Sequence, residues 1–222
     1  MIQRKKTIVA GVMKPGVRRP ASGALLMRPA SAALLTRRVS GARFVAIALL
    51  ALLAALPSPA REFMTQQQAL ASAFPKGSSI ERETIFLTKE ELARASRASG
   101  VEIEGALVVR YVAKTGGRVV GFAYFDVHRV RTLPETVMVV VTPESAIGRI
   151  EILSFKEPMD YFPRERWIDQ FDGKMLDDEL SLNRAIRPIS GATLTGRSIT
   201  NAARKILAIH EVIEQRAMSD EQ

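Results

Sequence analysis

Cysteine is absent from the whole sequence, and histidine occurs only twice, as His128 and His210. The lack of cysteine excludes disulfides, a lipid-modified cysteine, iron–sulfur clusters and haem attached through a C-x-x-C-H motif. Two histidines are too few for a histidine-rich site, so no metal is expected; His210 should pack on a helix and His128 should end a strand. Any redox chemistry would depend on a non-metal cofactor.

Acidic residues are missing from residues 1–60, although this segment holds ten of the chain's 32 lysines and arginines. Residues 61–222 keep the other 22 basic side chains against 23 acidic ones, which gives them a net charge of −1. The net charge of +9 for the whole chain therefore comes from its first 60 residues. Because the remainder is nearly neutral, no nucleic-acid partner is expected.

The first 60 residues have the features of an export signal. A basic region ends at Arg43, an apolar run covers residues 44–56, and small residues up to Ala60 suit cleavage. The apolar run is shorter than the roughly 20 residues that a membrane-spanning helix needs. We expect an exported protein, periplasmic or on the outer face of the inner membrane, cleaved after Ala60. An uncleaved anchor and a start codon at Met27 stay open as alternatives.

Residues 61–222 are numerous enough for one domain with a hydrophobic core. The pattern predicts an α+β fold, with an antiparallel sheet of four to five strands packed with helices. Thr88 and Glu91 form a capping-box pattern, and Gly116 and Gly117 predict a tight hairpin turn. The expected helices are 61–74, 88–98, 164–171 and 198–216, and the expected strands are 80–87, 106–114, 118–127, 136–142 and 146–155.

The segment at residues 190–195, SGATLT, sets small residues and hydroxyls just before the amphipathic helix at 198–216. That helix carries apolar or small residues on one stripe, at Ile199, Ala202, Ala203, Ile206, Ile209 and Ile213. The first turn of a helix has unpaired N–H groups and the positive end of the helix dipole. The arrangement predicts an anion site, specifically a phosphate site, although an ordinary helix cap stays open.

This segment resembles the S/T-G-A-T-x-T signature of the FMN-binding domain found in Rnf G-type subunits and in C-type subunits of sodium-pumping NADH:quinone reductases. The resemblance implies that FMN is joined by a phosphoester to Thr193 through a dedicated flavin transferase. It also implies that the rest of the segment lines the phosphate and ribityl chain: Ser190, Gly191, Ala192, Leu194 and Thr195. The family usually has an aspartate a few residues upstream, whereas this chain has Arg187.

The segment at residues 156–174 is rich in aromatic residues, and in the resembled family the equivalent connection helps to wall the flavin. Glu157 with Pro158 partly matches a Glu and Pro of that connection, so Glu157 is a candidate flavin contact. Stacking on the flavin by Trp167, Tyr161 or Phe155 is a second hypothesis, and packing of these aromatics in the local core is the alternative.

The sequence is expected to divide into a leader (1–60), a helix–strand–helix segment (61–104), an FMN-binding domain (105–216), to which the resemblance applies, and a tail (217–222). The implied function is an exported, membrane-associated FMN electron-transfer protein that relays electrons between membrane and extracytoplasmic redox proteins. Whether it is itself an enzyme is left open. A reductase with non-covalently bound FMN and an exported scaffold without a cofactor are the alternatives.

Overall fold

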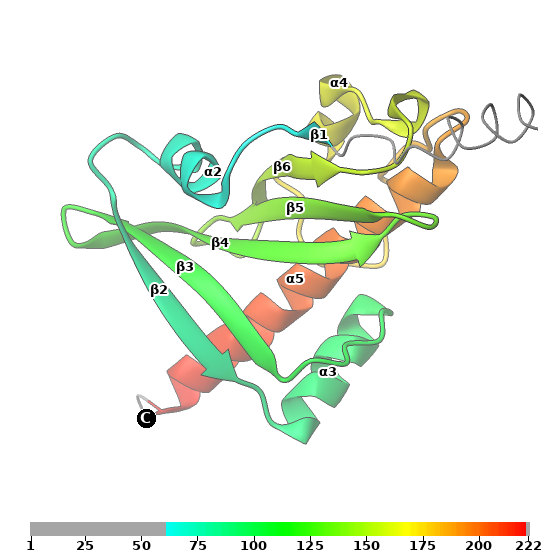
Figure 1. The fold of residues 1–222 in the computed structure, drawn as a ribbon. Helices are drawn as coiled ribbons and strands as arrows, with labels where there is room; N and C mark the ends of the chain where they lie inside the picture. The colour runs from blue at the N-terminus through cyan, green and yellow to red at the C-terminus, as the bar shows by residue number, and fades with distance from the viewer. Residues whose placement is uncertain (1–60, 221–222) are drawn as a thin grey trace, which may run out of the picture. The chain divides into compact units, whose positions relative to one another are not determined.

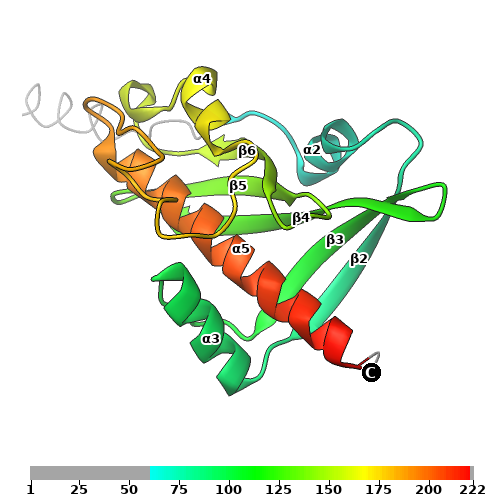
Figure 2. The same cartoon turned by 180° about the vertical axis from the view of Figure 1, so that it is seen from behind.

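The computed structural model describes residues 61–220, which form one sheet with helices on both faces (Figure 1 and Figure 2). The predicted export signal at residues 1–60 lies outside this range. In chain order the elements are β1 (Arg61–Glu62), α2 (Gln66–Ala73), β2 (Ser79–Phe86), α3 (Lys89–Ser99), β3 (Leu107–Thr115), β4 (Arg118–Arg129), β5 (Pro134–Val141), β6 (Ile147–Phe155), η1 (Met159–Tyr161), α4 (Glu165–Ile168), η2 (Asp169–Phe171) and α5 (Thr193–Asp220).

The sheet is antiparallel throughout, in the order β1-β6-β5-β4-β3-β2, which confirms the predicted α+β class. It has six strands rather than four or five, because Arg61 and Glu62 pair with the end of β6. The helix expected from residue 61 consequently starts at Gln66. Thr65 fixes that start, since its hydroxyl accepts the Gln68 N–H at 3.3 Å and its own N–H donates to the Gln68 side chain at 2.8 Å.

The predicted capping box at Thr88 and the predicted glycine turn are both present in the structure. Thr88 caps α3 through a complete capping box with Glu91, and Gly100 ends the helix in the left-handed conformation. Gly116 and Gly117 have φ angles of 58° and 79° and join β3 to β4 in a two-residue turn. These local signals set the register of the first hairpin, from which the rest of the sheet extends.

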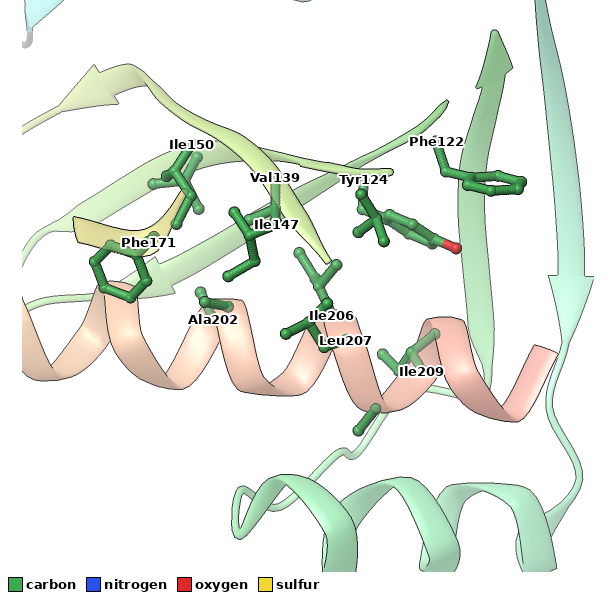
Figure 3. Close-up of a cluster of buried hydrophobic side chains, with 14 of the residues drawn as sticks. Phe122, Tyr124, Val139, Ile147, Ile150, Phe171, Ala202, Ile206, Leu207 and Ile209 are labelled. Carbon is green, nitrogen blue, oxygen red and sulfur yellow. The ribbon is translucent and has the colours of Figure 1, made fainter. Parts of the chain in front are cut away.

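The sheet has a hydrophobic core on each face. On one face, α5 and α3 cover side chains of the central strands, and Val139, Ile147 and Ile150 point toward Ala202 and Ile206 of α5 (Figure 3). On the other face, α2 covers a smaller cluster that includes Ala123 and Met138. Both cores consist of residues from 64 to 213, so the chain from Arg61 onward has a core of its own, as an independently folding domain requires.

Helix α5 runs diagonally across the sheet and begins at Thr193, five residues before the predicted start (Figure 2). All six residues of its predicted apolar stripe are buried. Burying each isoleucine contributes roughly 1.5–3 kcal/mol, so packing on the sheet, more than helix propensity, holds α5 in place. None of the helices within residues 61–220 combines the length and the apolar character that crossing a membrane requires.

Candidate functional site

The SGATLT segment begins in the loop before α5 and ends inside the helix, whereas the sequence predicted that the whole segment precedes the helix. Gly191 takes a φ of +81°, a left-handed conformation that favours glycine, and the Ala192 N–H donates to the Ile189 carbonyl at 3.2 Å. The Ala192 carbonyl then accepts the Gly196 N–H at 3.1 Å, which closes the first turn of α5. Thr193, Leu194 and Thr195 therefore belong to that first turn, where N–H groups lack intrahelical partners and attract an anion.

A cavity of about 300 Å³ lies against this helix start. Five residues of the SGATLT segment line it together with Glu157, so the structure brings together most of the predicted site residues. The remaining lining comes from the end of β4 and the turn after it, and from η1: Val130, Arg131 and Tyr161. Ser190 precedes the lining residues, and its side chain is exposed.

The two threonines of the segment differ in exposure. Thr193 is exposed at the cavity, so its hydroxyl is accessible to another protein. Thr195 is only 1 % exposed, and its Oγ1 has no hydrogen-bond partner among the described residues. An unpaired buried hydroxyl costs about 1–3 kcal/mol, so a polar ligand group in the cavity would satisfy it. A phosphate or ribityl oxygen fits that requirement.

Glu157 lines the cavity and holds the turn between β4 and β5. Its Oε1 accepts three backbone N–H groups of the turn between β4 and β5, from Arg131 at 3.2 Å, Thr132 at 2.7 Å and Leu133 at 2.8 Å. Burial alone would raise the pKa of Glu157, but these donors outweigh burial and hold the pKa below its ordinary value. The ionised carboxylate therefore fixes the turn that presents Arg131.

Arg131 supplies the positive charge of the cavity, since the other basic residues of the described chain do not line it. Its guanidinium forms no ion pair with a described carboxylate, and lies 5.9 Å from the Tyr161 ring centroid. It donates to the Tyr161 hydroxyl at 3.4 Å. Sequence reasoning missed Arg131. The predicted strands 118–127 and 136–142 place it in the turn between them, but nothing in the pattern shows that this turn meets α5.

The aromatic candidates occupy three different positions. Tyr161 lines the cavity, whereas Phe155 is 1 % exposed and packs in the core against Phe162. Trp167 lies outside the cavity lining, against Gly196 on the first turn of α5, and its indole N–H donates to the Arg187 carbonyl at 2.6 Å. Stacking of Trp167 on a flavin stays a prediction.

A buried polar cluster lies farther back along the same strands. His128 Nδ1 is 2.8 Å from Asp126 Oδ2, and His128 Nε2 is 2.9 Å from Glu135 Oε2. Lys205 of α5 pairs with the other oxygen of Asp126. Burial alone would lower the pKa of His128, but hydrogen bonds to Asp126 and Glu135 raise it to about 9. Within residues 61–220, no group of three or more His, Cys, Asp or Glu side chains is placed to hold a metal ion.

The chain is similar to one protein family and to a solved structure. Residues 133–208 match the family model described as the FMN-binding domain, a range that includes Glu157 and the whole SGATLT segment. No curated protein matches the chain. Among solved structures, the crystal structure of Shewanella oneidensis NqrC is similar with a TM-score of 0.45 and 14 % sequence identity, covering 66 % of this chain and 88 % of that one. The family match confirms the predicted resemblance.

Proposed function

Because residues 133–208 form an FMN-binding domain, FMN is the cofactor of this chain, and we propose that the protein is an exported electron carrier with FMN joined to Thr193. When bound, FMN supplies one- and two-electron redox chemistry, and the protein supplies placement and electrostatics. The observation that carries the proposal is the exposed Thr193 hydroxyl on the first turn of α5, beside a cavity holding Arg131 and the unpaired Thr195 hydroxyl.

The residues of the cavity fit a phosphate. The start of α5 offers N–H groups and the positive end of the helix dipole, and its first turn contains no acidic residue. Arg131 adds a full positive charge, and Thr195 adds a hydroxyl donor. Glu157 also lines the cavity, but its Oε1 accepts the N–H groups of the β4–β5 turn. Together these groups would hold the phosphate next to Thr193.

Transfer from a flavin dinucleotide would form the bond between the Thr193 oxygen and the flavin phosphorus, break the diphosphate bond of the donor, and release a nucleoside monophosphate together with the hydroxyl proton. The chain would gain the mass of FMN less one water. The exposure of Thr193 gives a flavin transferase access to the reacting oxygen. Arg187, which stands where related chains carry an aspartate, is exposed just before the segment. A transferase that requires the aspartate would leave FMN bound without the covalent bond.

Export and partners complete the proposal. The basic leader and apolar run of residues 1–60 support transfer across a membrane, and a covalent bond would keep the flavin from being lost in a compartment without a free pool. The donor and acceptor would be membrane and extracytoplasmic redox proteins. The described residues hold no arrangement that we assign to substrate catalysis, which favours a carrier over a reductase that acts alone.

The intact mass of residues 61–222, after co-expression with a flavin transferase, tests the proposal. We expect wild type to gain the mass of FMN less one water and to keep its yellow colour after denaturation. Thr193→Ala should show no gain. Thr115→Ala is the matched control. Thr115 is an exposed threonine at the end of β3, where it pairs with the first residue of β4, and it does not line the cavity, so this variant should load normally.

Two other outcomes would contradict the proposal in different ways. Yellow colour that is lost on denaturation would support non-covalent FMN and the reductase alternative. A colourless protein without added mass would support the scaffold alternative and exclude the carrier.

A further inference from the structure

A basic hollow of about 840 Å³ lies beside α4 and η2. We define it by the four cations that line it, Arg164, Arg166, Lys174 and Arg187, with Trp167 and Gln170 between them. No acidic residue lines it. The FMN cavity and the polar cluster around His128 share none of these residues, so the basic hollow is a separate feature.

Charges are segregated across the short helices. Arg164, Arg166 and Gln170 line the basic hollow, whereas Glu165 and Asp169 of the same segment line a different hollow, beside Phe63 and Ile168. Alternation of charge along the sequence therefore becomes separation of charge in space. Because Glu165 and Asp169 line the other hollow, no acidic side chain cancels the positive charge inside the basic hollow.

The four cations also lack internal partners. None of them forms an ion pair with a carboxylate of residues 61–220, unlike Arg110, Arg149 and Arg216. Residues 61–222 as a whole carry a net charge of −1, so overall charge does not account for four free cations around one hollow. Like charges held close together repel, and a bound anion relieves that repulsion.

Two hydrogen bonds hold the walls of the basic hollow together. The Trp167 indole N–H donates to the Arg187 carbonyl at 2.6 Å, and the Arg187 N–H donates to the Gln170 side chain at 2.9 Å. Trp167 also lies so close to Gly196 that a Cβ there would be 3.3 Å from the indole ring. Gly196 is three residues after Thr193, about 4.5 Å along the axis of α5. An occupant of the basic hollow would lie beside the flavin attachment site.

We propose that the basic hollow is the docking site for an acidic segment of a redox partner protein. This inference rests on the proposed electron-carrier function, because it gives the partner a position next to Thr193. Complementary charge would steer the encounter and set the orientation of the partner.

A protruding acidic segment fits the basic hollow better than a membrane surface does. The cations line a concavity, whereas a flat anionic membrane is contacted best by cations that project outward with apolar side chains. The indole of Trp167 is held by Arg187 and packed against Gly196 and Phe171, so it is not presented as a membrane anchor.

Binding of a fluorescein-labelled polyglutamate peptide to residues 61–222, followed by anisotropy, tests the proposal. We expect wild type to bind at low salt and to release the peptide as salt screens the charges. Arg164→Glu with Arg166→Glu should weaken binding about tenfold or more, the fold-change expected when attraction becomes repulsion. Arg94→Glu with Arg97→Glu is the matched control, because both arginines are exposed on α3 and should leave affinity within about twofold.

Equal losses in the two double variants, or no loss in either, would overturn the proposal. Pelleting of wild type with phosphatidylglycerol vesicles, abolished by the Arg164 and Arg166 changes while the peptide fails to bind, would overturn it in favour of a membrane. Thr193→Ala should bind the peptide normally, and the Arg164 and Arg166 variant should still gain the flavin mass. Failure of the docking site and failure of flavin attachment are therefore distinguishable.

Discussion

The two histidines of the chain lie between the sheet and α5, yet their proton affinities move in opposite directions. His128 on β4 has its pKa raised to about 9, whereas His210 on α5 has its pKa lowered to about 4. Both side chains are largely buried, and burial by itself lowers the pKa of a histidine. Burial therefore does not explain the difference.

The neighbours of each ring decide the direction. His128 bonds to two carboxylates, Asp126 and Glu135, which outweigh burial. His210 Nδ1 is 2.9 Å from the Tyr124 hydroxyl, and its Nε2 has no partner among the described residues. Burial is the main cause of its lowered pKa, and the attraction of Glu214 is partly offset by Arg110.

The difference separates the molecule into two ends. The end of β4 that leads into Arg131 and the FMN cavity contains buried charge, held in balance by His128, Asp126, Glu135 and Lys205. Around His210, Phe122 packs against the imidazole ring, and the Arg110 guanidinium, which pairs with Glu83 and Glu214, lies 5.1 Å from the Phe122 ring centroid. Beside the FMN cavity one imidazole is bonded to two carboxylates, whereas His210 has one polar contact, to an uncharged hydroxyl.

The largest expected effect comes from breaking the charged cluster at Asp126. Asp126→Asn should lower the free energy of unfolding by about 4 kcal/mol, because it leaves Lys205 and His128 without their shared counter-charge. Urea unfolding at neutral pH measures the loss. Glu151→Gln at the partly exposed pair with Arg149 is the control and should cost less than about 1 kcal/mol. An equal loss in the two variants would show that the buried cluster stabilises the fold no more than a partly exposed ion pair does.

A smaller change in the free energy of unfolding is expected when pH is varied. His128 should decide the alkaline limb of the curve of stability against pH, and His210 the acid limb. The raised pKa of His128 gives stability that is fully present below pH 6.5 and is lost as pH rises toward about 9. The lowered pKa of His210 gives stability that is present above pH 6.5 and is lost as pH falls toward about 4. Each limb should amount to about 3 kcal/mol, because one pKa unit corresponds to about 1.4 kcal/mol.

Urea unfolding across this pH range, with His128→Gln and His210→Gln, separates the limbs. His128→Gln should flatten the alkaline limb, and His210→Gln should flatten the acid limb. Asp126, Glu135 and Lys205 face His128, and Glu214 and Arg110 act on His210. Because His128 also lowers the pKa of Asp126 and opposes the raised pKa of Glu135, the His128 assignment is judged on the alkaline limb alone. If the free energy of unfolding changed with pH in the same way in wild type and both variants, the assigned pKa shifts of His128 and His210 would be contradicted.

The smallest effect is expected at the uncharged contact between Tyr124 and His210. Tyr124→Phe removes the hydroxyl that bonds to His210 and should cost about 1 kcal/mol, the net contribution of an uncharged hydrogen bond. Urea unfolding should place this loss well below that of Asp126→Asn. A loss as large as that of the charged cluster would remove the contrast between the two ends of β4.

Local signals made much of the fold predictable. The capping box at Thr88, the glycine pair at Gly116 and Gly117, and the apolar stripe of α5 each depend on residues close in sequence. The SGATLT segment likewise marked one wall of the site, because small residues and hydroxyls before an amphipathic helix predict an anion site.

Several errors and omissions involve partners on other elements of the fold. Arg61 and Glu62 join the sheet only because the end of β6 lies beside them, and no local pattern predicts that strand. Arg131 reaches the cavity because Glu157 binds three N–H groups of its turn from 24 to 26 residues away. His128 gained its carboxylate partner Glu135 through the pairing of β4 with β5.

Because Trp167 packs against Gly196, its fluorescence can report whether a flavin is present at Thr193. Trp167 is the only tryptophan in the chain, and it touches the first turn of the helix that starts at Thr193. Oxidised flavin absorbs light in the range where indole emits, so energy transfer to a flavin at Thr193 would quench the tryptophan fluorescence. The emission of a single natural fluorophore would then follow flavin loading in real time, without any label added to the chain.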